Sequence, residues 1–444
     1  MEFYKNKLKE KVDLIFKNKG LENNLVLKDS LFIGIKPGKY EIVWDIKQEN
    51  ILKLEPINGE VNIESGVYHV NTGSNNFGSH WKTLYSYQYI EFSLKEERDK
   101  KIKEVFKTMK TILVTGGAGY IGTHTIVELL KDPNYDVILL DNFSNSNLLI
   151  LNQLKKVTNK PIKVYDFDCR SNLDDIFSDN KIDGVIHFAA FKSVGESVEN
   201  PLLYYDNNIN SLINLLNTCQ RFGVNNFVFS SSCSLYGNVL PGDLPVNEET
   251  PLSDPESPYA YTKLVGERIL QDFSNSNPDF KIISLRYFNP VGAHESGLIG
   301  ELPINKPNNI LPVICNSADT GEEMTIFGTD YDTPDGSCIR DYIHVSDIAN
   351  AHYLALEYVF QTMENSYDVF NLGSEKGYSV IELISAFEEE NEVKVNAVFG
   401  NRREGDVVKI YSDSFKARKL LNWKAEKTID DIVKSAWNWH KNKI

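Results

Sequence analysis

The chain has 444 residues, which is long enough for two or three domains, and its 41% hydrophobic and 25% charged residues are typical of a globular protein. Its formal net charge of −15 argues against a nonspecific nucleic-acid binder. The sequence contains no run of about 18 apolar residues, so we expect no membrane span. Five widely spaced cysteines without a Cys-x-x-Cys pair predict no disulfide framework, no metal site and a reducing, cytoplasmic location.

Charge divides the chain into two parts. Residues 1–108 carry 18 Lys and Arg against 16 Asp and Glu, whereas residues 109–444 carry 29 against 46. The stretch 95–108 is highly charged and helix-prone, and we predict that it forms a linker helix. We therefore expect an additional module fused to a complete catalytic unit that begins at Met109.

The first part, residues 1–94, is predicted to be a small, mostly antiparallel β module. After a possible short helix, apolar residues alternate in short runs that include residues 31–35, 40–46 and 51–54. Pro-Gly and Asn-Gly pairs between such runs favour hairpins. Its function is unknown: a row of tyrosines on one strand face would either form core or stack on a sugar or peptide, namely Tyr85, Tyr87 and Tyr89.

A glycine-rich loop opens the second part. The apolar run Ile112–Val114 leads into Thr115-Gly116-Gly117-Ala118-Gly119-Tyr120-Ile121-Gly122, and an apolar helical pattern follows. In a strand–loop–helix unit of this spacing, the glycines permit a tight turn, close approach of a pyrophosphate and close helix packing. The helix N-terminus then directs free N–H groups at the phosphates. The pattern predicts a dinucleotide site.

The next strand identifies the dinucleotide. Residues 136–140 form an apolar run that ends in Asp141. A carboxylate at this position accepts hydrogen bonds from the adenosine ribose hydroxyls and repels a 2′-phosphate, so NAD is favoured over NADP.

Further strands predict an α/β fold with a Rossmann-type, doubly wound parallel sheet. We expect an NAD-binding domain over residues 109–289. A smaller substrate domain is expected over residues 290–444, part of which returns to the Rossmann domain. The additional strands are expected at Lys163–Tyr165, Gly184–Phe188, Asn226–Phe229 and Ile282–Arg286.

A candidate catalytic set follows two of these elements. Ser232 comes after the strand at Asn226–Phe229, where ligands bind in parallel sheets. Tyr259 and Lys263 are four residues apart and share a helix face. A lysine cation beside a phenol is expected to lower the pKa of the phenol, which makes Tyr259 a general base toward a sugar hydroxyl. Tyr261 lies on a different helix face and is the weaker candidate.

From about Lys110 to Trp439 the chain resembles the UDP-glucose 4-epimerases (UDP-galactose 4-epimerases), a family of extended short-chain dehydrogenases/reductases. The resemblance covers about three quarters of the chain. Besides the glycine loop, it rests on the segments 187–197, 204–208, 287–294, 340–345 and 402–406, which read HFAAFKSVGES, YYDNN, YFNPVGAH, RDYIHV and RREGD.

This resemblance implies a set of site residues. Catalysis would fall to Ser232, Tyr259 and Lys263. NAD, held as a tightly bound group, would contact Gly116, Gly119, Tyr120, Ile121, Gly122, Asp141, Asn142, Asn145, Ser146, Asp168, Phe188, Ala189, Lys192, Asn207, Tyr259, Lys263 and Tyr287. The UDP-sugar would contact Ser232, Tyr259, Asn289, Asn309, Phe327, Arg340, Arg403 and Asp406.

The implied reaction interconverts UDP-glucose and UDP-galactose in galactose metabolism, by oxidation at sugar C4, rotation of the keto sugar and reduction from its other face. The resemblance also implies a homodimer through helices around Asn208–Phe222 and Tyr259–Phe273. Ile410 stands where the family gates space beside the sugar 2-substituent, so use of N-acetylated sugars stays open.

Other functions fit the sequence less well. A 4,6-dehydratase is disfavoured because Cys233-Ser234 replaces the Asp-Glu pair of related dehydratases after the strand-end hydroxyl. An epimerase of UDP-N-acetylhexosamines or UDP-pentoses stays possible. A non-catalytic nucleotide-sugar sensor is disfavoured because Ser232, Tyr259 and Lys263 occur together.

Overall fold

The computed structural model describes residues 25–27, 33–35, 41–45, 50–55, 109–303, 307, 309–403 and 406–443. The chain forms two compact units, residues 1–96 and 97–444. In the first unit, β1 (Leu25–Leu27) pairs antiparallel with β2 (Ile33–Ile35), and β3 (Glu41–Asp45) with β4 (Asn50–Glu55). The expected tyrosine strand and the linker helix at 95–108 lie outside the described residues, so the β module of residues 1–94 stays a prediction.

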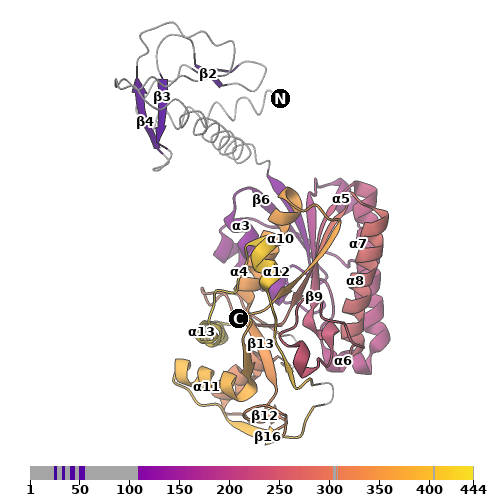
Figure 1. Ribbon diagram of the computed structural model, residues 1–444, viewed down its shortest axis with the longest axis vertical. Coiled ribbons are helices and arrows are strands. Elements are labelled where there is room, and N and C mark those ends of the chain that lie inside the picture. The colour runs from indigo at the N-terminus through magenta and orange to yellow at the C-terminus, as the bar shows by residue number, and fades with distance from the viewer. Residues whose placement is uncertain are drawn as a thin grey trace, which may run out of the picture. The chain divides into compact units, whose positions relative to one another are not determined.

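The second unit is built on a seven-stranded parallel sheet, as the sequence predicts (Figure 1). The strand order β14-β10-β9-β8-β5-β6-β7 places the first strand of the unit in the interior, with crossovers running to both sides of it. The strands are β5 (Lys110–Thr115), β6 (Tyr135–Asp141), β7 (Lys163–Asp166), β8 (Gly184–His187), β9 (Asn226–Ser232), β10 (Lys281–Tyr287) and β14 (Tyr367–Leu372).

Helices cover both faces of this sheet. Successive strand residues point to opposite faces, so Ile112 and Val114 of β5 pack in one core and Leu113 in the other. The first core is completed by α3 (Tyr120–Lys131), α4 (Ile150–Thr158), α10 (Val345–Gln361) and α12 (Phe415–Leu421). The second is completed by α5 (Asp174–Ser178), α7 (Pro201–Phe222) and α8 (Pro258–Ser276), with α6 (Val194–Glu199) leading into α7.

A smaller lobe follows β10 and has its own apolar core, which includes Leu311, Phe387 and Trp437. Its helices are α9 (Ile310–Thr320), α11 (Val380–Asn391) and α13 (Ile429–Asn442). One small sheet joins β11 (Asn289–Val291), β13 (Ile339–His344), β15 (Gly377–Ser379) and β17 (Lys409–Ile410), and another pairs β12 (Met324–Phe327) with β16 (Ala397–Gly400).

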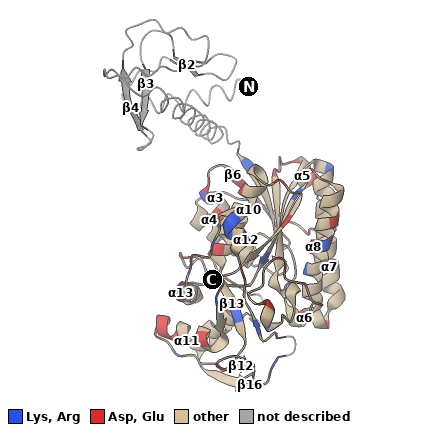
Figure 2. Ribbon diagram, in the orientation of Figure 1, with Lys and Arg blue, Asp and Glu red and all other residues tan. Residues whose placement is uncertain are grey.

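Local sequence fixes the helix ends of this lobe. Ser379 accepts a hydrogen bond from the Glu382 N–H, and the Glu382 side chain bonds back to the Ser379 N–H. Thr428 and Asp431 form the same capping box at the start of α13. Glutamates near the C-terminal end of α11 add to the acidic surface of this unit (Figure 2).

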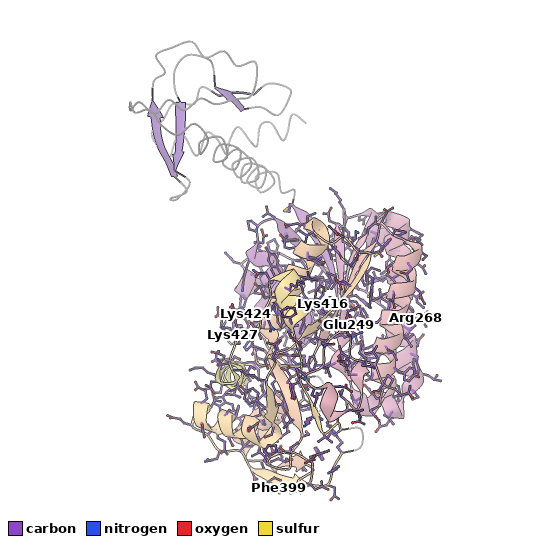
Figure 3. The ribbon with its side chains drawn as sticks, viewed as in Figure 1. Glu249, Arg268, Phe399, Lys416, Lys424 and Lys427 are labelled. Carbon is purple, nitrogen blue, oxygen red and sulfur yellow. The ribbon has the colours of Figure 1, made fainter. Side chains whose placement is uncertain are left out.

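Parts of the C-terminal segment return to the large sheet. Strand β14 pairs in parallel with β10 at the sheet edge, and α12 packs against it. Lys416 of α12, labelled in Figure 3, forms an ion pair with Asp368 of β14 at 2.5 Å. The two lobes are therefore joined by chain segments that cross between them as well as by packing.

Candidate active site

A cavity of about 500 Å³ lies at the carboxyl ends of the parallel strands and extends toward the smaller lobe. Every residue predicted to hold the cofactor lines it. Of the residues predicted to hold the UDP-sugar, the cavity walls include Ser232, Tyr259, Asn289, Asn309, Arg340 and Asp406, whereas Phe327 and Arg403 are not part of the walls.

The glycine loop packs so closely against neighbouring backbone that side chains would not fit at two of its positions. Gly116 has φ +68°, and a Cβ there would lie 2.6 Å from the Ala189 nitrogen. A Cβ on Gly122 would lie 2.5 Å from the Gly116 carbonyl oxygen. The loop therefore presses against β8 and against the start of α3, whose free N–H groups suit a pyrophosphate. These residues fit NAD.

Asp141, at the end of β6, is held ready to bind a ribose. Its Oδ1 accepts hydrogen bonds from the Phe143 N–H and the Ser146 hydroxyl, both at 2.9 Å, and its Oδ2 accepts one from the Ala118 N–H at 3.0 Å. A carboxylate oxygen has two lone pairs, so Oδ2 keeps one for a ligand hydroxyl. Burial raises the pKa of Asp141, and these hydrogen bonds oppose the increase.

Asp168, predicted to contact NAD, is paired with Arg170, which was not among the predicted site residues. Arg170 donates to both of its oxygens, at 3.0 and 2.7 Å, and Asn142 donates to Oδ2 at 3.1 Å. The Arg170 hydrogen bond holds the pKa of Asp168 at about 2. Arg170 also bonds to Asp206 of α7. An arginine two residues after the aspartate that follows β7 was the available signal.

The candidate catalytic residues meet at the ends of β9 and β10. Ser232 pairs in register with Tyr287 on the neighbouring strand, and its hydroxyl accepts from the Ser234 N–H at 3.2 Å. Ser257 caps α8 and Pro258 occupies the first turn, which places Tyr259 at the helix start. Lys263, one turn later, donates from Nζ to the Ser230 carbonyl oxygen at 2.6 Å.

The expected lowering of the Tyr259 pKa is wrong for the chain as the structure describes it. Burial raises the pKa of Tyr259 to about 12, and a hydrogen bond with Ser232 only partly opposes this. Lys263 Nζ lies 6.0 Å from the centre of the Tyr259 ring. Burial also lowers the pKa of Lys263 to about 8. Desolvation is the largest cause of the pKa shift of both groups, and it disfavours the charged form of each.

A buried ion pair supports this set from behind. Glu267, one turn after Lys263 on α8, accepts from Arg286 Nε at 2.9 Å and Nη2 at 2.7 Å. Ser231 of β9 bonds to the same carboxylate, and Arg286 also donates to the Tyr236 hydroxyl at 3.0 Å. Because both charges are buried and paired twice, the network locks α8 against β9 and β10.

The smaller lobe contributes a cationic wall. Arg340 Nη1 donates to the Val407 carbonyl oxygen at 2.7 Å, and its Nη2 lies 3.4 Å from Asp406 Oδ1. Arg403 Nη2 donates to the same oxygen at 2.9 Å, and its guanidinium lies 5.6 Å from the centre of the Phe327 ring. The structure therefore brings together Arg340, Arg403, Asp406 and Phe327. Arg403 and Phe327 do not line the cavity. Two guanidinium groups suit a pyrophosphate.

Ile410 is buried and lines the cavity, in an apolar cluster with Leu235, Tyr236 and Phe288. Cys169 and Cys233 also line it, and burial raises the pKa of both thiols to about 12. His187 shares a hydrogen bond of 2.7 Å with Thr115. Tyr261 does not line the cavity and is 40% exposed.

A glycine loop after an interior strand of a doubly wound sheet, with serine, tyrosine and lysine at the carboxyl edge of the sheet, defines a dinucleotide-dependent enzyme of the short-chain dehydrogenase/reductase type. The model of the NAD dependent epimerase/dehydratase family matches residues 112–373. The chain belongs to this family, and its cofactor is NAD.

Individual relatives agree with this assignment. The chain is 45% identical to UDP-glucose 4-epimerase 2 of Arabidopsis thaliana, over 75% of this chain and 95% of that protein. It is 46% identical to UDP-glucose 4-epimerase of Erwinia amylovora, over 74% of this chain and 97% of that protein. The solved structure of UDP-glucose 4-epimerase from Bifidobacterium longum, in complex with NAD+ and UDP, is 45% identical and superposes with a TM-score of 0.72, over 75% of this chain and 99% of that one.

Proposed function

We propose that the chain interconverts UDP-glucose and UDP-galactose by inverting the configuration at sugar C4. The observation that carries the proposal is the convergence of Ser232, Tyr259 and Lys263 on one cavity whose other walls hold the glycine loop and Arg340. Relatives of this name align over almost their whole length. A sensor without turnover would not need a base and its lysine at the end of the cofactor cleft.

Each catalytic residue has one task. Tyr259, as the phenolate, takes the proton of the sugar 4-hydroxyl and later returns it to the inverted oxygen. Ser232 orients the same hydroxyl. Lys263, held by the Ser230 carbonyl, keeps a cation near the ring of Tyr259. NAD, when bound, supplies the hydride acceptor and donor for C4, and its positive nicotinamide ring favours the phenolate that burial disfavours.

The proposed reaction must use both faces of the sugar. Arg340 and Asp406 are pinned by main-chain and ion-pair contacts, so they hold a nucleotide in one position. We expect the sugar to be held less tightly than the nucleotide, so that its 4-keto form can turn. Because NAD is regenerated in each cycle, we expect it to stay bound between turnovers.

The test is conversion of UDP-galactose by the purified chain without added NAD. We expect UDP-glucose to form, and we expect Tyr259→Phe to abolish its formation while NAD stays bound. Failure of the wild type with UDP-galactose, together with turnover of a UDP-N-acetylhexosamine or a UDP-pentose, would replace the proposed substrate. Failure with all of them, with nucleotide binding intact, would favour the sensor.

The chain is further proposed to act as a homodimer through α7 and α8. Apolar side chains on α7 are unusually exposed: Leu202 by 80%, Leu203 by 43% and Ile213 by 41%. Tyr261 of α8 is also exposed. Exposed apolar side chains on these two helices support an interface between two copies of the chain. Light scattering during gel filtration should give twice the chain mass, and Ile213→Asp should reduce it to the monomer.

We place this activity in the cytoplasm, because the five cysteines are all free thiols. Among the helices that the structure describes, none is long and apolar enough to span a membrane.

A further inference from the structure

Glu301 connects the two binding regions of the cavity. Its Oε1 accepts a hydrogen bond from Lys192 Nζ at 2.9 Å and another from Asn309 Nδ2 at 2.5 Å. All three residues line the cavity. The Glu301 side chain is only 13% exposed, whereas that of Lys192 is 51% exposed. A mostly buried carboxylate therefore positions an exposed cation and an amide.

The backbone at Glu301 is fixed independently of its side chain. The Glu301 carbonyl oxygen accepts a hydrogen bond from Trp439 Nε1 at 3.0 Å. Gly300 packs on the same indole so closely that a Cβ would lie 2.4 Å from the ring. Because α13 anchors this segment, the carboxylate is held in place, and a change of the side chain leaves the anchor intact.

The two partners of Glu301 are expected to bind different ligands. Lys192 Nζ lies 5.9 Å from the ring centre of Tyr120, the first residue of α3, and so faces the pyrophosphate end of the cofactor cleft. The negative charge of Glu301 contributes to raising the pKa of Tyr120, after burial. Asn309, the residue before α9, belongs to the smaller lobe, where the nucleotide of the substrate is expected.

We propose that Glu301 is a positioning residue that aligns Lys192 for NAD and Asn309 for the UDP-sugar, and so couples the two ligands through one carboxylate. The proposal rests on the proposed function for the identity of the second ligand. Its physical basis is charge-assisted hydrogen bonding, which gives a flexible lysine a defined direction. In this ion pair the lysine also neutralises the charge of Glu301, so the carboxylate does not repel the phosphates that are expected nearby.

The experiment separates effects on the two ligands. On the holoenzyme we would measure UDP affinity by calorimetry and the rate at which bound NAD exchanges with isotopically labelled NAD. We expect Lys192→Met to speed NAD exchange and Asn309→Ala to weaken UDP binding, each by about tenfold and each with little effect on the other ligand. Glu301→Ala should produce both changes.

Glu295→Gln is the matched control, because Glu295 lies in the same stretch of chain, is exposed and does not line this cavity. Glu301→Gln keeps an acceptor for Asn309, so it should restore UDP affinity more than NAD retention. If Glu301→Ala changes only one ligand, or neither, the proposal is wrong. A wild type that binds UDP without turning over UDP-galactose would defeat the proposed function, and the binding pattern would still decide the role of Glu301.

Discussion

Lys263 Nζ lies 6.0 Å from the centre of the Tyr259 ring and donates its hydrogen bond to the main-chain oxygen of Ser230 instead of to the phenol. The lysine therefore acts on the tyrosine through space, as a fixed charge. Because a backbone carbonyl holds the Lys263 ammonium group, its charge keeps its position while the sugar changes orientation.

The first prediction concerns this charge. Lys263→Met should lower kcat by about 100-fold or more, the usual size of a lost acid–base contribution. In the wild type, burial lowers the pKa of Lys263 to about 8, so its cation is complete below that pH and lost above it. We therefore expect kcat/KM for UDP-galactose to fall as the pH rises through about 8. A profile that keeps rising to pH 10 would contradict the role of the cation.

The second prediction concerns the glycine loop. Gly116→Ala should lose bound NAD, because the new Cβ would overlap the Ala189 nitrogen and φ there is +68°. Cofactor content of the purified chain measures this directly. Gly195→Ala is the control: a Cβ there meets nothing within 4 Å, and the residue lies in α6. Retention of NAD by the Gly116 variant would show that the close approach is not required.

The third prediction concerns substrate size. Ile410 is 4% exposed and lines the cavity. Ile410→Ala opens space there and should raise kcat/KM for UDP-N-acetylgalactosamine relative to UDP-galactose by about tenfold or more. Parallel assays of both substrates give the ratio. An unchanged ratio would mean that another residue limits the size of the 2-substituent.

The fourth prediction concerns acid stability. Burial lowers the pKa of His124 and His187 to about 3, and that of His352 to about 4. Each folded pKa lies below the unfolded value of about 6.5. The contribution of each neutral histidine to the free energy of unfolding is therefore complete above about pH 6.5 and is lost as the pH falls toward the folded pKa. Each such group costs about 1.4 kcal/mol per pH unit within this window.

His352→Leu should therefore flatten the pH dependence of the unfolding free energy between pH 6.5 and about 4. The His352 Nε2 has no hydrogen-bond partner among the described residues, and the ring packs 4.7 Å from that of Phe188, so an apolar replacement suits the site. Denaturant titrations at several pH values give the slope. A variant with the wild-type slope would show that other groups dominate acid unfolding.

Local patterns in the sequence predicted the parallel sheet, the glycine loop and the candidate catalytic set, whereas most other residues of the cavity wall were predicted only through the resemblance to the UDP-glucose 4-epimerases. A glycine loop between an apolar strand and a helix has few alternatives, and Tyr259 and Lys263 share a face by helical spacing alone. Contacts between distant segments were not predictable: Glu301 meets Lys192 across 109 residues. The Tyr259 pKa was misjudged because the sequence shows its neighbour but not the burial that outweighs it.

The most direct test of the central claim is the fate of the hydrogen at sugar C4. UDP-galactose labelled with deuterium at C4 should give UDP-glucose that retains the deuterium at C4, because the same hydride is removed and returned within one closed site. Replacement of the label by solvent hydrogen would contradict inversion by transient oxidation and would require proton exchange at carbon instead.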